Sequence, residues 1–275
     1  MTRSILVGVS GPFTGPRSAY GDLLRDAAGE SPIAAQLSFA DDMAQVDQAI
    51  KVANGFVAAG VDAVVGHFNS DCARAAGRIY LDAGIPFLMP AATAPDLIDA
   101  TQGYRLCAPD DAQVHALEEW ASKMGVTLAE IWEDGSPYAE RIAALLQSRG
   151  LVDTSAARGS RPIAILGAHH AVAREMQRRK TFAGPVFVPD DCAISEFGEM
   201  ISGVDVHLLS AVATPCYSTC VEQAFQVLSR AISTKDTLGT ALAKDPMFLN
   251  NQSRLGRFTL IETQARHLHI GECLT

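Results

Sequence analysis

Two hydroxyl side chains follow neighbouring apolar runs of the chain, in positions that suit recognition of a small molecule. Ser70 comes just after the run Ala63–Phe68, and Thr93 comes just after the run Pro86–Met89. Open α/β sheets bind ligands outside the carboxyl ends of their strands, and the N–H groups of a following helix attract a carboxylate. Each residue alone is more typical of a helix cap or turn than of a binding site. The two together favour a binding site.

A third strand end offers less chemistry. The segment from Ser10 to Pro16 (SGPFTGP) is placed like a phosphate loop, but it has neither G-x-G-x-x-G nor G-x-x-x-x-G-K-[ST], and its two prolines remove backbone donors. We therefore expect a plain turn there and no nucleotide or other cofactor. The hydrolase signatures G-x-S-x-G and H-E-x-x-H are also absent. His67 follows a buried run and is expected to be a satisfied core histidine, so no catalytic residue is assigned.

The six cysteines raise two further possibilities, a disulfide framework and a metal site. A chain of this length with many core residues does not need disulfides, so we expect free, buried thiols. Cys216 and Cys220 form a C-x3-C pair, and His169–His170 or the pair His267 and His269 could complete a zinc site. Nothing in the sequence brings these groups to one place, so no metal is expected.

Composition limits the class of protein and its partners. The 275 residues are 48% hydrophobic and 7% aromatic, with a formal net charge of −9, which argues against nucleic acid as a partner. No apolar run reaches the roughly 18 residues that a membrane span needs. Residues 1–9 do not resemble a signal peptide, which favours the cytoplasm as the sequence stands. A signal peptide already removed would instead indicate the periplasm.

The elements that must position these residues alternate along the chain. Expected strands in the first half are Ile5–Val9, Ala35–Phe39, Ala63–Phe68 and Pro86–Met89, separated by expected helices Ser18–Ala28, Met43–Ala59 and Ser70–Ala83. In the second half, expected helices are Asp110–Met124, Tyr138–Ser148, Ala171–Phe182, Val221–Ile232 and Leu238–Ala243. Expected strands there are Leu128–Glu133, Ile163–Leu166, Val186–Pro189, Val206–Val212, Arg257–Glu262 and His267–Ile270. This alternation predicts parallel sheets covered on both faces.

The break between the two sets falls near residues 108–111. After two doubly wound units, the remaining C-terminal segment is too short to form a third domain. We therefore expect this segment to complete first one unit and then the other. The sequence predicts an N-terminal lobe of residues 1–109 plus about 221–256. The C-terminal lobe is predicted to hold residues 110–220 plus about 257–275.

The stretch from Gly60 to Leu97, GVDAVVGHFNSDCARAAGRIYLDAGIPFLMPAATAPDL, resembles the branched-chain amino-acid-binding proteins, which are type I periplasmic binding proteins of the Leu/Ile/Val kind. The turn from Ser10 to Gly21 also matches strongly, whereas the later motifs around Tyr138, Gly167–His170 and Val188–Asp191 match moderately. The resemblance implies two Rossmann-like domains, joined by three chain crossings, that close on a ligand like a hinge.

The resemblance also implies the site residues. Ser70, Ala91, Ala92 and Thr93 would hold the α-carboxylate and α-amino group of an amino-acid-like ligand. Tyr20 would line the side-chain pocket. From the second domain, Tyr138, His169 and Asp190 would complete the set.

The chain departs from the family pattern at two of these site residues and at two other positions. The family commonly has Tyr at the position of His169 and Glu at that of Asp190, and a cysteine pair of some members falls at Met43 and Asn69. Asp190 keeps the acid that could pair an ammonium, while a histidine could make binding pH-sensitive. The chain is also shorter than typical members, mainly between Pro215 and Leu260, so either another chain covers that surface or the domain is trimmed.

Several functional hypotheses stay open. The leading one is a non-enzymatic receptor for an amino acid or related compound, with an ABC permease as partner. The same pocket would serve an amide sensor that binds a regulatory protein, and either could form a homodimer. The second class is an enzyme on this scaffold that uses His67, His169 and Asp190. The third is an interaction module that has lost its pocket.

Overall fold

The computed structural model describes residues 4–31, 33–155, 157–249 and 257–264. The chain forms two compact α/β units, which confirms the predicted fold class. Unit 1 comprises Met1–Pro109 and Pro215–Gly256, and unit 2 comprises Asp110–Thr214 and Arg257–Thr275. The backbone therefore passes from one unit to the other three times.

Unit 1 is built on a parallel sheet whose strands lie in the order β2-β1-β3-β4-β5. The strands are β1 (Leu6–Gly11), β2 (Gln36–Asp41), β3 (Ala63–Gly66), β4 (Phe87–Met89) and β5 (Tyr104–Arg105). Strands β3 and β4 are buried along their whole length. Because the strands are parallel, their carboxyl ends share one edge, and the segments after β3 and β4 are neighbours there.

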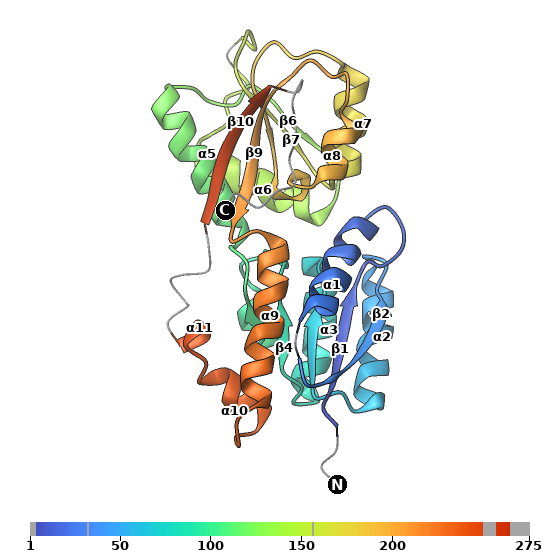
Figure 1. Cartoon of the computed structure of the whole chain (residues 1–275). Coiled ribbons are helices and arrows are strands. Elements are labelled where there is room, and N and C mark those ends of the chain that lie inside the picture. Colours follow the sequence, from blue (N-terminus) through green and yellow to red (C-terminus); the bar gives the residue numbers. More distant parts are fainter. Residues whose placement is uncertain (1–3, 32, 156, 250–256, 265–275) are drawn as a thin grey trace. The chain divides into compact units, whose positions relative to one another are not determined.

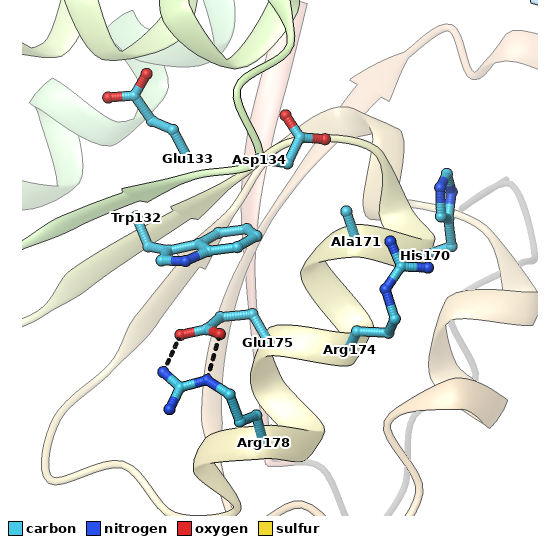
Figure 2. Close-up of a pocket in the computed structure, with 8 residues that line it drawn as sticks. All are labelled: Trp132, Glu133, Asp134, His170, Ala171, Arg174, Glu175 and Arg178. Carbon is cyan, nitrogen blue, oxygen red and sulfur yellow. Dashed lines mark hydrogen bonds and ion pairs between the residues drawn. The ribbon is translucent and has the colours of Figure 1, made fainter.

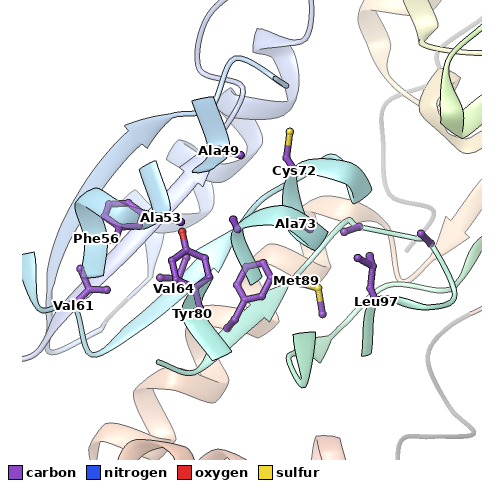
Figure 3. Close-up of a cluster of buried hydrophobic side chains, with 14 residues drawn as sticks. Ala49, Ala53, Phe56, Val61, Val64, Cys72, Ala73, Tyr80, Met89 and Leu97 are labelled. Atoms are coloured by element: carbon purple, nitrogen blue, oxygen red, sulfur yellow. The ribbon is translucent and has the colours of Figure 1, made fainter. Parts of the chain in front are cut away.

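The helices of unit 1 come from both of its chain segments (Figure 1). They are α1 (Ser18–Glu30), α2 (Val46–Ala59), α3 (Ser70–Asp82), α4 (Leu97–Thr101), α9 (Tyr217–Ile232), α10 (Leu238–Ala243) and α11 (Pro246–Leu249). Helix α9 packs against α1. Helices α2 and α3 pack together over a core that includes Phe56, Tyr80 and Phe87. Figure 3 shows Phe56 of α2 and Tyr80 of α3 within this cluster.

Unit 2 has a second five-stranded sheet, in the order β10-β9-β8-β7-β6. Its strands are β6 (Ile131–Glu133), β7 (Ile163–Leu166), β8 (Val186–Val188), β9 (His207–Thr214) and β10 (Arg257–Gln264). Its helices are α5 (Asp110–Met124), α6 (Pro137–Ser148), α7 (His169–Arg179), the short 3-10 helix η1 (Asp190–Cys192) and α8 (Ser195–Met200). Strand β10 runs antiparallel to β9, so the expectation of a wholly parallel sheet is wrong for unit 2.

Several predicted boundaries are wrong for identifiable reasons. Helix α2 starts at Val46 and not at Met43, because Met43 and Ala44 have positive φ angles that a helix cannot include. Residues 215–220 belong to unit 1, because α9 begins at Tyr217. The expected strand Leu128–Glu133 shortens to β6, and Leu128 forms only an isolated bridge with Val152. The expected strand His267–Ile270 lies outside the described residues.

The cysteines only partly follow the expectation. Cys72, Cys107, Cys192 and Cys220 are free and buried, as predicted. Cys216 is disulfide-bonded, so the prediction of a free thiol is wrong there. This residue is the N-cap of α9 and is partly exposed, outside the core that shields the four free thiols. In the described part of the chain, no helix is long and apolar enough to cross a membrane.

Candidate ligand-binding site

The end of β3 is shaped by a glycine that no other residue could replace. Gly66 has a φ of +131°, and a Cβ atom there would lie 1.9 Å from the backbone oxygen of Ser10. Strands β1 and β3 can therefore approach closely, and the chain turns directly into α3. Asn69 is the N-cap of α3 and Ser70 is its first residue, so the alternative reading of Ser70 as the cap is wrong.

The N-terminus of α3 lacks a side-chain cap. Its first N–H groups have no acceptor within the helix, and together they carry a partial positive charge. Oδ1 of Asn69 is buried and accepts no hydrogen bond from the described residues. The turn therefore offers both donors and an acceptor to a small polar molecule.

The loop after β4 is fastened to α3 by side chains. The backbone N–H of Ala94 donates to Oγ of Ser70 at 3.1 Å, and the guanidinium of Arg74 donates twice to the carboxylate of Asp96, at 2.9 and 2.8 Å. Arg105 of β5 donates from Nη1 to the backbone oxygen of Ala94 at 3.0 Å. Because Ser70 uses its oxygen as an acceptor, its hydroxyl proton can point elsewhere.

Thr93 is held in this fastened loop and is 4% exposed. Its hydroxyl makes no hydrogen bond with any residue that the structure describes. Ala91 and Ala92 are buried beside it, at 6% and 0% exposure. The structure thus brings Ser70 and the segment 91–93 together, as their position in the sequence predicted. Their contact with a ligand remains a prediction.

Tyr20 lies in a row of aromatic side chains in unit 1. Its ring centroid is 5.3 Å from that of Phe68, which is in turn 6.1 Å from the ring of Tyr217 at the start of α9. The Arg17 guanidinium lies over the Tyr20 ring at 5.1 Å. Tyr20 itself is only 2% exposed. Sequence reasoning missed Phe68 and Tyr217, although Phe68 immediately precedes the N-cap of α3.

His67 is confirmed as a satisfied core histidine. It is fully buried, with Nδ1 2.7 Å from a carboxylate oxygen of Asp42 and 3.2 Å from Oγ of Ser10. Nε2 lies 3.0 Å from the hydroxyl of Tyr80. Both ring nitrogens therefore have buried partners, and neither is open to a substrate. This arrangement is a buried hydrogen-bond network that links β1, β3 and α3, and it does not suit a catalytic base.

In unit 2, Tyr138 and Asp190 meet although they are 52 residues apart. Ser136 caps α6 by accepting from the backbone N–H of Ala139, and Pro137 opens the helix, so Tyr138 stands in its first turn. Its hydroxyl donates to Oδ1 of Asp190. Gln113 of α5 donates to the same oxygen at 2.8 Å and accepts from the backbone N–H of Asp190 at 3.2 Å.

Asp190 is an unusually basic carboxyl group. Burial and, after it, the nearby charge of Asp110 raise its pKa to about 7, although the hydrogen bonds from Tyr138 and Gln113 act in the opposite direction. Asp110 is fully buried and is paired with Arg141, whose Nε lies 3.2 Å from its carboxylate. The region thus holds more buried negative charge than its neighbouring cation can balance.

His169 is placed by a second strand-end glycine. Gly167 has a φ of +143°, and a Cβ there would lie 2.3 Å from the carboxylate carbon of Asp134. The carboxylate of Asp134 accepts from the backbone N–H of Ala168, and that of Asp191 accepts from the N–H of His169. The imidazole of His169 is buried, 3.2 Å from Glu196 and 3.5 Å from Asp191.

The structure does not join every candidate into one group. His169 contacts Asp191 and Glu196, whereas Asp190 contacts Tyr138 and Gln113. Sequence reasoning missed Gln113, which no local signal marks because 77 residues separate it from Asp190. Among the described residues, no three His, Cys, Asp or Glu side chains are placed to share a metal ion.

Comparison with curated proteins identifies relatives of one kind, although no family model matches the chain. Leu/Ile/Val-binding protein homolog 1 of Brucella abortus is 36% identical over 124 residues, covering 40% of this chain and 33% of that protein. The leucine-, isoleucine-, valine-, threonine- and alanine-binding protein of Pseudomonas aeruginosa is 35% identical, covering 38% and 30%. The match thus spans about a third of the length of these relatives.

Solved structures match over most of the chain. A leucine-binding protein of Thermotoga maritima gives a TM-score of 0.72 at 16% identity, covering 87% of each chain. The branched-chain amino-acid transporter substrate-binding protein of Streptococcus pneumoniae, solved with isoleucine, gives 0.70 at 18% identity, covering 88% of each. These matches establish the type I periplasmic binding-protein fold for this chain. An extracellular ligand-binding receptor of Rhodopseudomonas palustris has the same fold.

Proposed function

We propose that this chain, a relative of the Leu/Ile/Val-binding proteins with the type I periplasmic binding-protein fold, is a non-enzymatic receptor for an amino acid or an amino-acid-like compound. The names of its curated relatives make branched-chain amino acids the first candidates. The observation that carries the proposal is the uncapped N-terminus of α3, beside which Ser70 and Thr93 present hydroxyl groups.

The α-carboxylate is proposed to bind in unit 1. The N–H groups in the first turn of α3 and the two hydroxyls are donors, and the side chain of the N-cap residue Asn69 makes no capping hydrogen bond there. Ala91 and Ala92 are small, so they let a ligand approach the loop backbone closely. Tyr20, with Phe68 beside it, is proposed to supply the apolar wall for the ligand side chain.

The α-amino group is proposed to interact with Asp190 of unit 2. Burial and Asp110 disfavour the charged form of this carboxyl group, and an arriving ammonium would relieve that cost. Tyr138 orients the carboxylate through its hydrogen bond. His169 is proposed as a further polar contact, held by Asp191 and Glu196.

The absence of chemistry is also part of the proposal. One of the candidate catalytic groups of the enzyme hypothesis, His67, is a fully buried imidazole whose two ring nitrogens both face partners within the protein. A general base must reach the proton that it removes from a substrate. We therefore expect a bound ligand to be released unchanged.

The proposed setting is outside the cytoplasm. The disulfide at Cys216 is typical of an oxidising compartment, and one structural neighbour is an extracellular ligand-binding receptor. This favours the periplasmic alternative over the cytoplasmic one. An ABC permease is then the proposed partner, because the streptococcal neighbour is a transporter substrate-binding protein. Deleting the gene should slow uptake of whichever amino acid the purified chain binds.

A thermal unfolding screen against amino acids and their amides tests the proposal. A ligand at a hundred times its Kd should stabilise the chain by about 2.7 kcal/mol. NMR of the recovered ligand after long incubation should show no new compound. Turnover of any panel member would support an enzyme instead. No stabilisation by any member would support an interaction module without a working pocket.

A further inference from the structure

A pocket in unit 2 is lined by none of the residues proposed above to bind the amino acid, although the ring of its His170 lies 5.5 Å from that of His169. It has a volume of about 550 Å³, within the range of about 300–1,000 Å³ of ordinary small-molecule sites. It opens between the edge strand β6 and helix α7 (Figure 2). Its lining residues are Trp132, Glu133, Asp134, His170, Ala171, Arg174, Glu175 and Arg178.

The acidic groups of this pocket are largely engaged within the protein. The carboxylate of Asp134 accepts from the backbone N–H groups of Ser136 and Ala168. The carboxylate of Glu175 accepts from Arg178 at 2.8 and 2.7 Å and from Arg179 at 2.6 Å, and these arginines lower its pKa to about 2. Glu133 points away from Arg174 in Figure 2.

Arg174 is the contrasting group. It is exposed on α7, and it makes no ion pair or hydrogen bond with any residue in the described part of the chain. Figure 2 shows its guanidinium beside His170, with Trp132 across the pocket and the Ala171 methyl group between them. The pocket therefore combines the guanidinium of Arg174, the partly exposed indole of Trp132 and the small side chain of Ala171.

We propose that this pocket is a second binding site for a small aromatic carboxylate. The ring would stack on the indole of Trp132, because aromatic pairs prefer offset or edge contacts with such a surface. The carboxylate would accept two hydrogen bonds from the guanidinium of Arg174, whose planar fork matches it. A ligand with only the ring or only the carboxylate would contact just one of the two groups, Trp132 or Arg174, and should bind more weakly.

Benzoate is the test probe, and the two tryptophans provide separate reporters. In ¹⁵N-labelled protein, each indole N–H gives its own NMR signal, and Trp132→Phe identifies that of Trp132 by its loss. Trp120 serves as the internal reference, because its Nε1 already donates to Glu262 at 2.7 Å. Benzoate should shift the Trp132 signal in a saturable manner and leave that of Trp120 in place.

Two variants and two partial probes make the test specific. Arg174→Gln should weaken benzoate binding by at least about tenfold, since a charged hydrogen-bonding group is removed. Arg78→Gln, the same change at an exposed position of α3 in unit 1, should leave it unchanged. Acetate, inorganic phosphate and benzyl alcohol should each bind more weakly than benzoate. A stationary Trp132 signal, an unaffected Arg174→Gln variant, or equal binding of acetate or phosphate would overturn the proposal. None of these outcomes depends on amino-acid binding.

Discussion

In both units a glycine with a positive φ angle lies at the end of a buried strand, but the side chains at the start of the next helix differ. Gly66 ends β3 and Gly167 ends β7, each with positive φ and with no room for a Cβ atom. In unit 1 the helix that follows, α3, starts without a side-chain cap. In unit 2 the start of α7 is already occupied by the carboxylates of Asp134 and Asp191.

On the basis of this difference we propose that each unit recognises a different part of a zwitterion. The helix end in unit 1, where the side chain of the N-cap residue makes no capping hydrogen bond, suits a carboxylate. The filled helix end of unit 2 has no such capacity, and nearby Asp190 and Asp110 are buried acids that suit a cation. The same fold can therefore favour either an anionic or a cationic ligand group, depending on which side chains contact the first turn of the helix.

The largest effect is expected from Asp190→Asn. If Asp190 pairs an ammonium, the change should weaken binding of an amine ligand by about 2–5 kcal/mol, because the ligand charge loses its buried partner. A neutral analogue without the amino group should be affected much less. Calorimetry measures both affinities. Asp205→Asn removes the same charge from an exposed position of unit 2 and should change neither. Equal losses for both ligands would remove Asp190 as the ammonium partner.

The raised pKa of Asp190 also gives a pH test. Folded Asp190 holds its proton up to a pH of about 7, whereas the unfolded chain loses it near 3.8. Between these values the folded state binds more protons, so this group makes the unfolding free energy fall as pH rises. Denaturant titrations should show a flatter pH dependence in Asp190→Asn. Amine-ligand affinity of the wild type should rise as pH passes upward through about 7, and an unchanged profile in the variant would contradict the assignment.

Removing the hydroxyls of unit 1 should have an intermediate effect. Ser70→Ala and Thr93→Ala should each weaken binding of an amino acid by about 1–3 kcal/mol, because each deletes a hydrogen bond to a charged group. Ser122→Ala, at an exposed position of α5, is the matched control. The affinity of each variant and of the control for the amino acid can be measured by calorimetry at a pH above 7. If the double variant kept wild-type affinity, the open end of α3 would not be the carboxylate site.

The smallest effect is expected from loosening the loop that carries Thr93. Arg74 clamps this loop through Asp96 and also contacts Asp71 at 2.6 Å, but the pair is partly exposed. Arg74→Gln should therefore cost at most about 1 kcal/mol of binding. High salt should weaken the wild type towards the variant, since partly exposed ion pairs are screened. A loss as large as that of Ser70→Ala would mean that Arg74 contacts the ligand directly.

Sequence reasoning succeeded where the signal was local. The buried run Ala63–Gly66 and the periodic helix after it placed Ser70 at a strand end, and β7 and α10 match their predicted bounds. The missed elements have weak patterns: β5 has two residues, and α4 and α8 have five and six. The antiparallel direction of β10 could not be predicted, because alternation does not reveal strand direction.

The candidate site was less accessible to prediction in unit 2. The pKa of Asp190 depends on Gln113, Tyr138 and Asp110, which belong to α5 and α6 and lie far from Asp190 in the sequence. Their approach is a result of packing, and no spacing rule encodes it. Arg105, which holds the Ala94 carbonyl from the next strand, was missed for the same reason. Tyr138 and Asp190 were placed in the site only through the family resemblance, and their distant partners Gln113 and Asp110 were not found.

The most direct test of the account is a calorimetric comparison of three ligands with the wild-type chain. L-leucine carries both charged groups, isocaproate lacks the amine, and isoamylamine lacks the carboxylate. The account predicts that leucine, or another branched-chain amino acid used with its matching analogues, binds at one site per chain and is recovered unchanged, with both analogues much weaker. An analogue that binds as tightly as its amino acid would contradict the assignment of a carboxylate partner to one unit and an ammonium partner to the other.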